Sequence, residues 1–193
     1  MPAHLRRYDE PADTHFWTIS CQRRLTFFHD DGLKQIAVQG LRVLQQRFGV
    51  CLIGYVIMPE HVHVIVYPHP RGEDEPIPVS RLLHAFKQHV GFYGKQRLRE
   101  VWREHGALRS SPLNAWATGD EDEQTIWNVR GYDFNVRNHK ALLQKLDYCH
   151  KNPITRGLVE RSEQWAWSSY RFYEFDDRSV LAMDWDGRWP VIW

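Results

Sequence analysis

The spacing of hydrophobic residues in the first half of the chain alternates between strand-like and helix-like. Short runs rich in β-branched and aromatic residues predict strands, whereas apolar residues at intervals of three and four predict helices. Gly49 marks the end of the first predicted helix, and a tight turn at Pro59 joins two strands into a hairpin. The predicted order is strand, helix, strand, strand, helix, at residues 16–21, 31–48, 50–57, 62–67 and 79–98.

The second half of the chain begins with turn-forming and acidic residues and ends with a strongly periodic segment. Leu142, Leu146 and Cys149 recur at helical spacing, and Pro153 is expected to end their helix, because a residue before proline disfavours helical geometry. The predicted elements are a loop, a short strand and a helix, at residues 110–124, 126–129 and 138–152.

No repeat or linker divides the chain, so residues 1–193 are expected to form a single domain. Residues 160–193 are rich in tryptophan and are expected to be an extension that wraps the same body. Strands and helices in the order βαββαβ, followed by a late helix, predict an α+β fold with a ferredoxin-like antiparallel sheet and helices packed on it.

Composition indicates a folded protein of a reducing compartment. Hydrophobic residues make up 42% of the 193 residues, and the three cysteines have no short spacing that would predict disulfides or a zinc site. The longest apolar run, residues 50–58, is too short to span a bilayer, and the N-terminus has no apolar signal segment. We therefore expect no membrane association and a cytoplasmic protein, associated with the nucleoid if bacterial.

Charge is distributed unevenly although the formal net charge is only +1. Residues 81–110 hold seven Lys and Arg against two acids, and residues 137–161 hold six against two, so the rest of the chain is acidic. The two basic segments would meet a polyanion if they shared one face. Two solvated helix surfaces are the alternative interpretation.

His61 and His63 lie two residues apart in a predicted strand of valines. Side chains alternate between the faces of a strand, so both imidazoles point one way, roughly 7 Å apart along the chain, while Val62, Val64 and Val66 point the other. Two neutral imidazoles on one face can share a divalent metal ion. The spacing alone is weak evidence, since a chain with 11 histidines can contain such a pair by chance.

Tyr148 lies off the apolar stripe of the last predicted helix, and Asn152 follows it by one turn on the same side. A tyrosine hydroxyl attacks phosphodiesters when a metal ion and nearby cations stabilise the phenolate, and Lys145 and Lys151 lie three residues to either side. The alternative makes Tyr148 a boundary aromatic residue and Asn152 an ordinary residue of a helix C-terminus.

Three segments together resemble the single-tyrosine HUH transposases, and most of all their REP-associated tyrosine transposase branch. These segments are MPEHVHVIVYP, the stretch IWNVRGYDFNVRNHKALLQKLDYCHKNPITRGLV, and WAWSSYRFY. The resemblance covers most of the chain in the family's order. It implies that His61 and His63 are the metal-binding HUH pair, that Tyr148 is the nucleophile, and that Asn152 is a third polar ligand.

The resemblance further implies Mg²⁺ or Mn²⁺ as cofactor and single-stranded DNA with hairpins, such as repetitive palindromes, as substrate. Tyr148 would keep the 5′ end as a phosphotyrosine and release a 3′-OH. The protein is expected to be a monomer or a homodimer. Candidate DNA contacts are the basic residues Lys87, Arg97, Arg137, Lys145 and Lys151.

Two other functions remain open from the sequence. The first is a hairpin DNA- or RNA-binding regulator that has kept the fold and lost turnover. The second is a metal-dependent hydrolase with a structural Tyr148; it needs a further carboxylate or histidine, and alternation is expected to turn Glu60 to the opposite face. Trapping of a covalent protein–DNA adduct separates the three functions.

Overall fold

The computed structural model describes residues 13–70, 75–105, 112–118, 124–189 and 191. Four antiparallel strands form one sheet in the order β2-β3-β1-β4. Their bounds are Thr14–Ser20 for β1, Val50–Met58 for β2, His61–Pro70 for β3 and Tyr132–Val136 for β4. The α+β fold with a ferredoxin-like antiparallel sheet is therefore confirmed.

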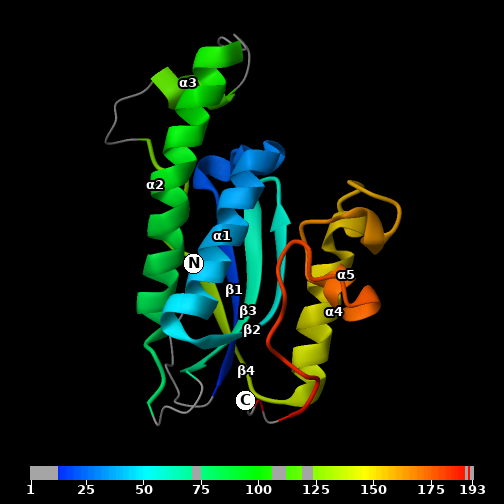
Figure 1. Cartoon of the computed structure of the whole chain (residues 1–193). Coiled ribbons are helices and arrows are strands. Elements are labelled where there is room, and N and C mark those ends of the chain that lie inside the picture. The colour runs from blue at the N-terminus through cyan, green and yellow to red at the C-terminus, as the bar shows by residue number, and fades with distance from the viewer. Residues whose placement is uncertain (1–12, 71–74, 106–111, 119–123, 190, 192–193) are drawn as a thin grey trace, which may run out of the picture.

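Helices cover both faces of the sheet (Figure 1). Asp31–Phe48 (α1) and Val79–His105 (α2) lie on one face, with Pro112–Thr118 (α3) at one end of α2, and His139–Thr155 (α4) and Tyr170–Phe175 (α5) lie on the other. Three short 3-10 turns complete the described elements, at Gln22–Arg24, Phe27–His29 and Ser162–Gln164. None of the described helices is both long and apolar enough to cross a membrane.

Two hydrophobic cores result, one on each face of the sheet. Trp17 and the valines of β3 pack with α1 and α2, whereas Phe16 and Ile65 pack with the apolar stripe of α4. Gly54 permits this second contact to be close, because a Cβ atom there would lie 2.6 Å from Cδ1 of Leu146. The packing holds α4 directly on the sheet.

Local sequence signals explain the helix ends. Asp30 caps α1 by accepting a 2.8 Å hydrogen bond from the Leu33 N–H, and Gly49 ends it with a left-handed φ of 63°. Asn138 caps α4 in the same way, through Ala141. The predicted span of the first helix is confirmed, and α2 continues seven residues beyond its predicted end at Leu98.

The fourth strand was predicted in the wrong place. Trp127 makes only an isolated bridge to Cys21, and the strand that joins the sheet is β4, six residues further on. Its apolar positions alternate with Asp133 and Asn135, and the buried Asp133 carboxylate pairs with His15 at 3.0 Å. That hydrogen bond allows a polar residue to lie on the inner face of the strand.

The prediction that Pro153 ends the last helix was also wrong. Proline cannot donate the bond to the carbonyl four residues earlier. The Arg156 N–H nevertheless bonds to the Asn152 carbonyl and the Leu158 N–H to that of Pro153, so α4 continues to Thr155. The predicted loop at 110–124 is likewise wrong where described, because it contains α3.

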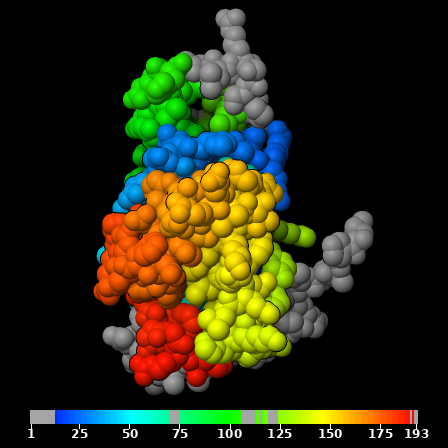
Figure 2. All heavy atoms as spheres, turned by 90° about the vertical axis from the view of Figure 1, so that its right-hand side faces the viewer, coloured from blue at the N-terminus to red at the C-terminus, as the bar shows by residue number. Residues whose placement is uncertain are grey.

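The C-terminal segment packs on the sheet through backbone hydrogen bonds to β2. Ile57 N–H donates to the Trp167 carbonyl, Ser169 N–H to that of Tyr55, and Asp184 N–H to that of Leu52, so the segment covers the edge of β2. Trp165 and Trp167 are partly buried against the cores, and Trp185 is buried. Figure 2 shows this face, with α4 in yellow beside α5 in orange and the last described residues in red.

Candidate active site

The two histidines of β3 converge on the α4 face of the sheet, as the alternation predicted. Val62, Val64 and Val66 enter the opposite core. Nε2 of His61 lies 3.0 Å from Nε2 of His63, and both side chains are buried. Two ring nitrogens therefore point into the same small volume.

The other nitrogen of each ring has an oxygen neighbour outside this volume. Thr18 Oγ1 lies 2.9 Å from Nδ1 of His63, because β1 pairs Thr18 directly with His63. Glu60 Oε1 lies 3.2 Å from Nδ1 of His61 and accepts a 2.8 Å hydrogen bond from Arg156. Groups that hold Nδ1 orient an imidazole and leave Nε2 for a metal ion.

The position of Glu60 corrects the expectation that it lies on the opposite face. Glu60 belongs to the turn between β2 and β3, where strict alternation does not apply, and its buried carboxylate turns toward His61. It meets Nδ1 of that ring, on the side away from His63. In this arrangement the Glu60 carboxylate is placed to orient the His61 ring.

Burial keeps both imidazoles neutral near neutral pH. It lowers the pKa of His63 to about 3, with His61 contributing in the same direction. Burial also lowers the pKa of His61, although the Glu60 carboxylate opposes the change. Neutral imidazoles have the lone pairs that metal binding requires.

Tyr148 projects from α4 beside the histidine pair. Leu142, Leu146 and Cys149 are buried as predicted, whereas the Tyr148 side chain is 49% exposed. Its ring centroid lies 5.1 Å from that of His63, at an interplanar angle of 69°. The structure therefore brings the predicted nucleophile next to the predicted metal-binding pair, with one side open to solvent.

The remaining polar residues of α4 differ in their surroundings. Asn152 is buried one turn beyond Tyr148, and its role as a metal ligand stays a prediction. His150 points away from Tyr148, as expected, and bonds through Nε2 to Ser169 Oγ at 3.0 Å. The two sides of α4 thus face different parts of the sheet.

One of the predicted DNA-binding cations lies at the site. The Lys145 ammonium group lies 4.7 Å from the ring centroids of both Phe16 and Phe134. The others have protein partners: Lys151 pairs with Asp147, Arg137 with Asp13, Arg97 with Asp30, and Lys87 with backbone carbonyls. Their contact with DNA stays a prediction.

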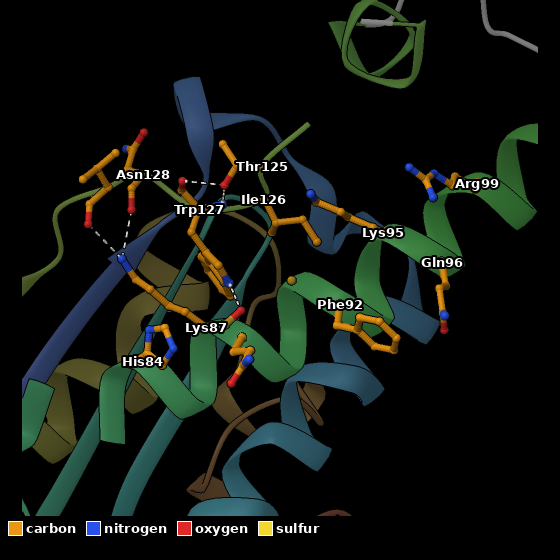
Figure 3. A pocket seen from close by; sticks show the side chains of 13 residues that line it. His84, Lys87, Phe92, Lys95, Gln96, Arg99, Thr125, Ile126, Trp127 and Asn128 are labelled. Carbon is orange, nitrogen blue, oxygen red and sulfur yellow. Dashed lines mark hydrogen bonds between the residues drawn. The ribbon is translucent and has the colours of Figure 1, made fainter. Parts of the chain in front are cut away.

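Lys87 lines a cavity of about 560 Å³ between α2 and residues 125–129 (Figure 3). Its ammonium group donates to the carbonyls of Asn128 and Val129, at 2.9 and 3.3 Å. Lys95 and Arg99 also line this cavity, which gives it a basic wall on α2. The cavity lies on the α2 side of the sheet, whereas the histidine pair faces α4.

The sequence did not reveal Thr18, Phe16 or Glu60 as parts of the site. Phe16 stacks on His63 with 5.2 Å between ring centroids and also contacts Tyr148 edge-on. Contacts of this kind depend on the register between β1 and β3, which hydrophobic periodicity does not specify. Only a prediction of strand pairing could have identified Thr18 and Phe16, and the position of Glu60 depends on the turn before β3.

Two curated relatives of this chain carry the same family name, although no family model matches the chain. The REP-associated tyrosine transposase of Escherichia coli is 22% identical over 182 residues, covering 94% of this chain and 90% of the relative. A Haemophilus influenzae protein provisionally given the same name is 22% identical over 187 residues, covering 96% and 94%.

A solved structure has the same fold. It is a REP-associated tyrosine transposase bound to a REP hairpin, with a TM-score of 0.62, 21% identity, and coverage of 96% of this chain and 92% of that one. Sequence relatives and fold agree over nearly the whole chain, and the HUH histidines and the tyrosine of the sequence motifs meet in one place. Over nearly its whole length, the chain is therefore similar in sequence and fold to REP-associated tyrosine transposases.

Proposed function

We propose that this protein cleaves and rejoins single-stranded DNA next to a hairpin, through a covalent bond between Tyr148 and the 5′ phosphate. The observation that carries the proposal is the meeting of His61 Nε2, His63 Nε2 and the half-exposed Tyr148 ring. Phosphoryl transfer needs a nucleophile and stabilisation of charge at one phosphate, and this arrangement offers places for both.

The residues present fit a divalent metal ion. The Nε2 atoms of His61 and His63 are buried and converge, Thr18 orients the His63 ring through Nδ1, and the amide oxygen of the buried Asn152 would complete a neutral ligand set. Among the described residues, no group of three or more His, Cys, Asp or Glu side chains could hold a metal. A bound Mg²⁺ or Mn²⁺ would supply Lewis-acid polarisation of the scissile phosphate.

The chemistry of this chain's own residues is a transesterification. The Tyr148 oxygen forms a bond to phosphorus after losing its proton, the bond from phosphorus to the 3′ oxygen breaks, and that oxygen leaves after gaining a proton. One phosphodiester is exchanged for another, so no ATP is needed and a 3′-OH can reverse the step. The Lys145 ammonium group lies over the Phe16 ring, which also contacts Tyr148, and is the candidate partner of the substrate phosphate.

The relatives and the basic surfaces support a hairpin-containing DNA substrate. A related transposase has been solved bound to a REP hairpin. In this chain, the basic cavity on α2 is a candidate contact for the phosphates of a hairpin stem, and Lys145 for those of a single strand. We expect binding to structured single strands that falls steeply with salt.

Trapping of a covalent adduct tests the proposal. A labelled hairpin oligonucleotide with single-stranded flanks, incubated with Mg²⁺ or Mn²⁺, should migrate with the protein on a denaturing gel. Tyr148→Phe keeps the ring and should bind the hairpin without forming the adduct, and Tyr170→Phe is the matched control that should keep it. Hairpin binding without any adduct in the native protein would support the non-catalytic regulator instead, and cleavage without an adduct would support the hydrolase.

A further inference from the structure

Two aromatic side chains stand exposed on the edge strand β4. Tyr132 and Phe134 are 43% and 38% exposed, and their rings stack at an interplanar angle of 14° with centroids 6.5 Å apart. Neighbouring aromatic residues left in water on an edge strand contribute little to a core. Their exposure therefore requires another explanation.

Strand register places both rings on the same face as the histidine pair. Thr18 of β1 pairs with Tyr132 on one side and with His63 on the other, so the three residues form one row across the sheet. Directly opposite residues of antiparallel strands point to the same face, and each strand spacing is about 4.8 Å. The backbone of Tyr132 thus lies roughly 10 Å from that of His63.

A chain of contacts connects these exposed rings to the site. The Lys145 ammonium group lies 4.7 Å from the ring centroid of Phe134 and the same distance from that of Phe16. The Phe16 ring then contacts His63 and Tyr148. A surface of flat apolar rings with one cation therefore leads directly to the proposed scissile phosphate.

This combination suits unpaired nucleotides. Bases stack on aromatic side chains whatever their sequence, and stacking contributes about 1–3 kcal/mol per base, while a lysine contacts the phosphate between them. We propose that Tyr132 and Phe134 form a stacking platform for the unpaired bases beside the cleavage position, with Lys145 at the intervening phosphate. The inference rests on the proposed function, because it places the single strand of that substrate.

Fluorescence of a base analogue tests the platform without any cleavage. The probe is a hairpin whose single-stranded flank carries 2-aminopurine at one position at a time, since stacking quenches this base. The native protein and Tyr148→Phe should both quench the probe at a position near the cleavage point. Joint replacement by Tyr132→Leu and Phe134→Leu should remove the quenching, and should weaken binding of the flanked hairpin by about 5- to 150-fold, the equivalent of one stacked base.

Two controls make the result specific. Binding of the same hairpin without its flank should be unchanged by the double replacement, and Phe175→Leu, at an exposed phenylalanine of α5, should affect neither measurement. Equal loss of flanked and blunt hairpin binding would overturn the platform. So would unchanged quenching in the double variant, or a native dimer in sedimentation that the double replacement dissociates, because the patch would then bind a second copy.

The test also separates this inference from the proposed function. Quenching that depends on Tyr132 and Phe134 in a protein that forms no covalent adduct would keep the platform and overturn cleavage. Adduct formation with unchanged quenching in the double variant would keep cleavage and overturn the platform.

Discussion

The two edge strands of the sheet, β2 and β4, differ in how far they are buried. All nine residues of β2 are buried, because the C-terminal segment pairs with its backbone and packs tryptophans against it. Of the described strands, β4 pairs with β1 alone, and its aromatic residues Tyr132 and Phe134 remain exposed. An edge strand is ordinarily covered or charged to prevent association. Tyr148 and Lys145 lie toward this edge, which no other described strand pairs with.

Helix α4 has different neighbours on the side toward β2 and on the side toward β4. On one side His150 bonds to Ser169 and packs against Tyr173 of the C-terminal segment. On the other side Lys145 and Tyr148 lie over Phe16, toward β4. We therefore expect the β2 edge to contribute to stability and the β4 edge to substrate binding, so replacements at each edge should change different measurements.

The largest effect is expected at the histidine pair. His63→Ala removes one of two converging Nε2 atoms, so we expect a loss of cleavage of at least about 100-fold, with hairpin affinity nearly unchanged. Removal of divalent metal with EDTA should have the same effect on the native protein. His139→Ala, at an exposed histidine of α4, is the matched control and should cleave normally. Cleavage by His63→Ala at near-native rate would remove the pair from the mechanism.

A smaller loss of cleavage is expected when the Glu60 carboxylate beside His61 is replaced. Glu60→Gln keeps the shape but weakens the hold on Nδ1 of His61, and replacements of such partners cost about 10- to 100-fold in metal affinity or activity. The half-saturating Mn²⁺ concentration for cleavage should rise, and excess Mn²⁺ should restore part of the rate. Glu163→Gln, near the β2 edge, should leave the metal dependence unchanged. An unaltered Mn²⁺ titration in Glu60→Gln would contradict the positioning role.

At the covered edge the expected change is in stability. Ser169 Oγ accepts the Tyr55 N–H at 3.1 Å in a buried setting, so Ser169→Ala leaves that donor unpaired and should lower the free energy of unfolding by about 1–3 kcal/mol. Urea denaturation measures the loss, with Ser80→Ala as an exposed control. Cleavage well below the unfolding transition should change less than about threefold. If Ser169→Ala lost most of its cleavage activity but kept native stability, the β2 edge would not have the purely stabilising role expected here.

The smallest expected effect lies away from both edges, at the ion pair between Arg97 and Asp30. Burial alone would raise the pKa of Asp30, but the Arg97 guanidinium and the Leu33 N–H outweigh it and hold the pKa below its usual value. The unfolded chain therefore takes up this proton first as the pH falls. The pair stabilises the fold above about pH 4 and loses that contribution below it.

Urea denaturation of native protein and Arg97→Gln at several pH values measures this contribution. The two should differ by up to about 1 kcal/mol at pH 7, as is usual for a partly exposed pair, and converge toward pH 2. A difference that stayed constant down to pH 2 would show that Arg97 acts through packing instead.

Hydrophobic periodicity predicted most of this fold because most of its elements are long or strongly patterned. The 18 residues of α1 and the valine-rich β3 have clear periods, and the same reasoning placed Tyr148 off the buried stripe of α4. The five-residue β4 was missed because its alternation includes the buried polar residue Asp133. A buried polar residue is stable only through a partner, here His15, that lies far away in the sequence.

The candidate site was predictable to the extent that it lies within single elements. His61 and His63 share a strand, so their common face follows from the chain itself. Thr18 and Glu60 come to these rings through strand register and a turn, which residue spacing does not encode. The sequence shows that Tyr132 is present, but not that it lies in line with Thr18 and His63 across the sheet. That alignment follows only from the pairing of the strands.

The position of the covalent bond is the most direct test of Tyr148 as the nucleophile. Digestion of the trapped protein–DNA adduct, followed by mass spectrometry, identifies the tyrosine that carries the nucleotide. We expect the nucleotide on the peptide that contains Tyr148, whose ring centroid lies 5.1 Å from that of His63. A nucleotide on Tyr132 or Tyr170 would contradict it, because the reacting phosphate would then lie at the edge of the sheet or on the far side of α4.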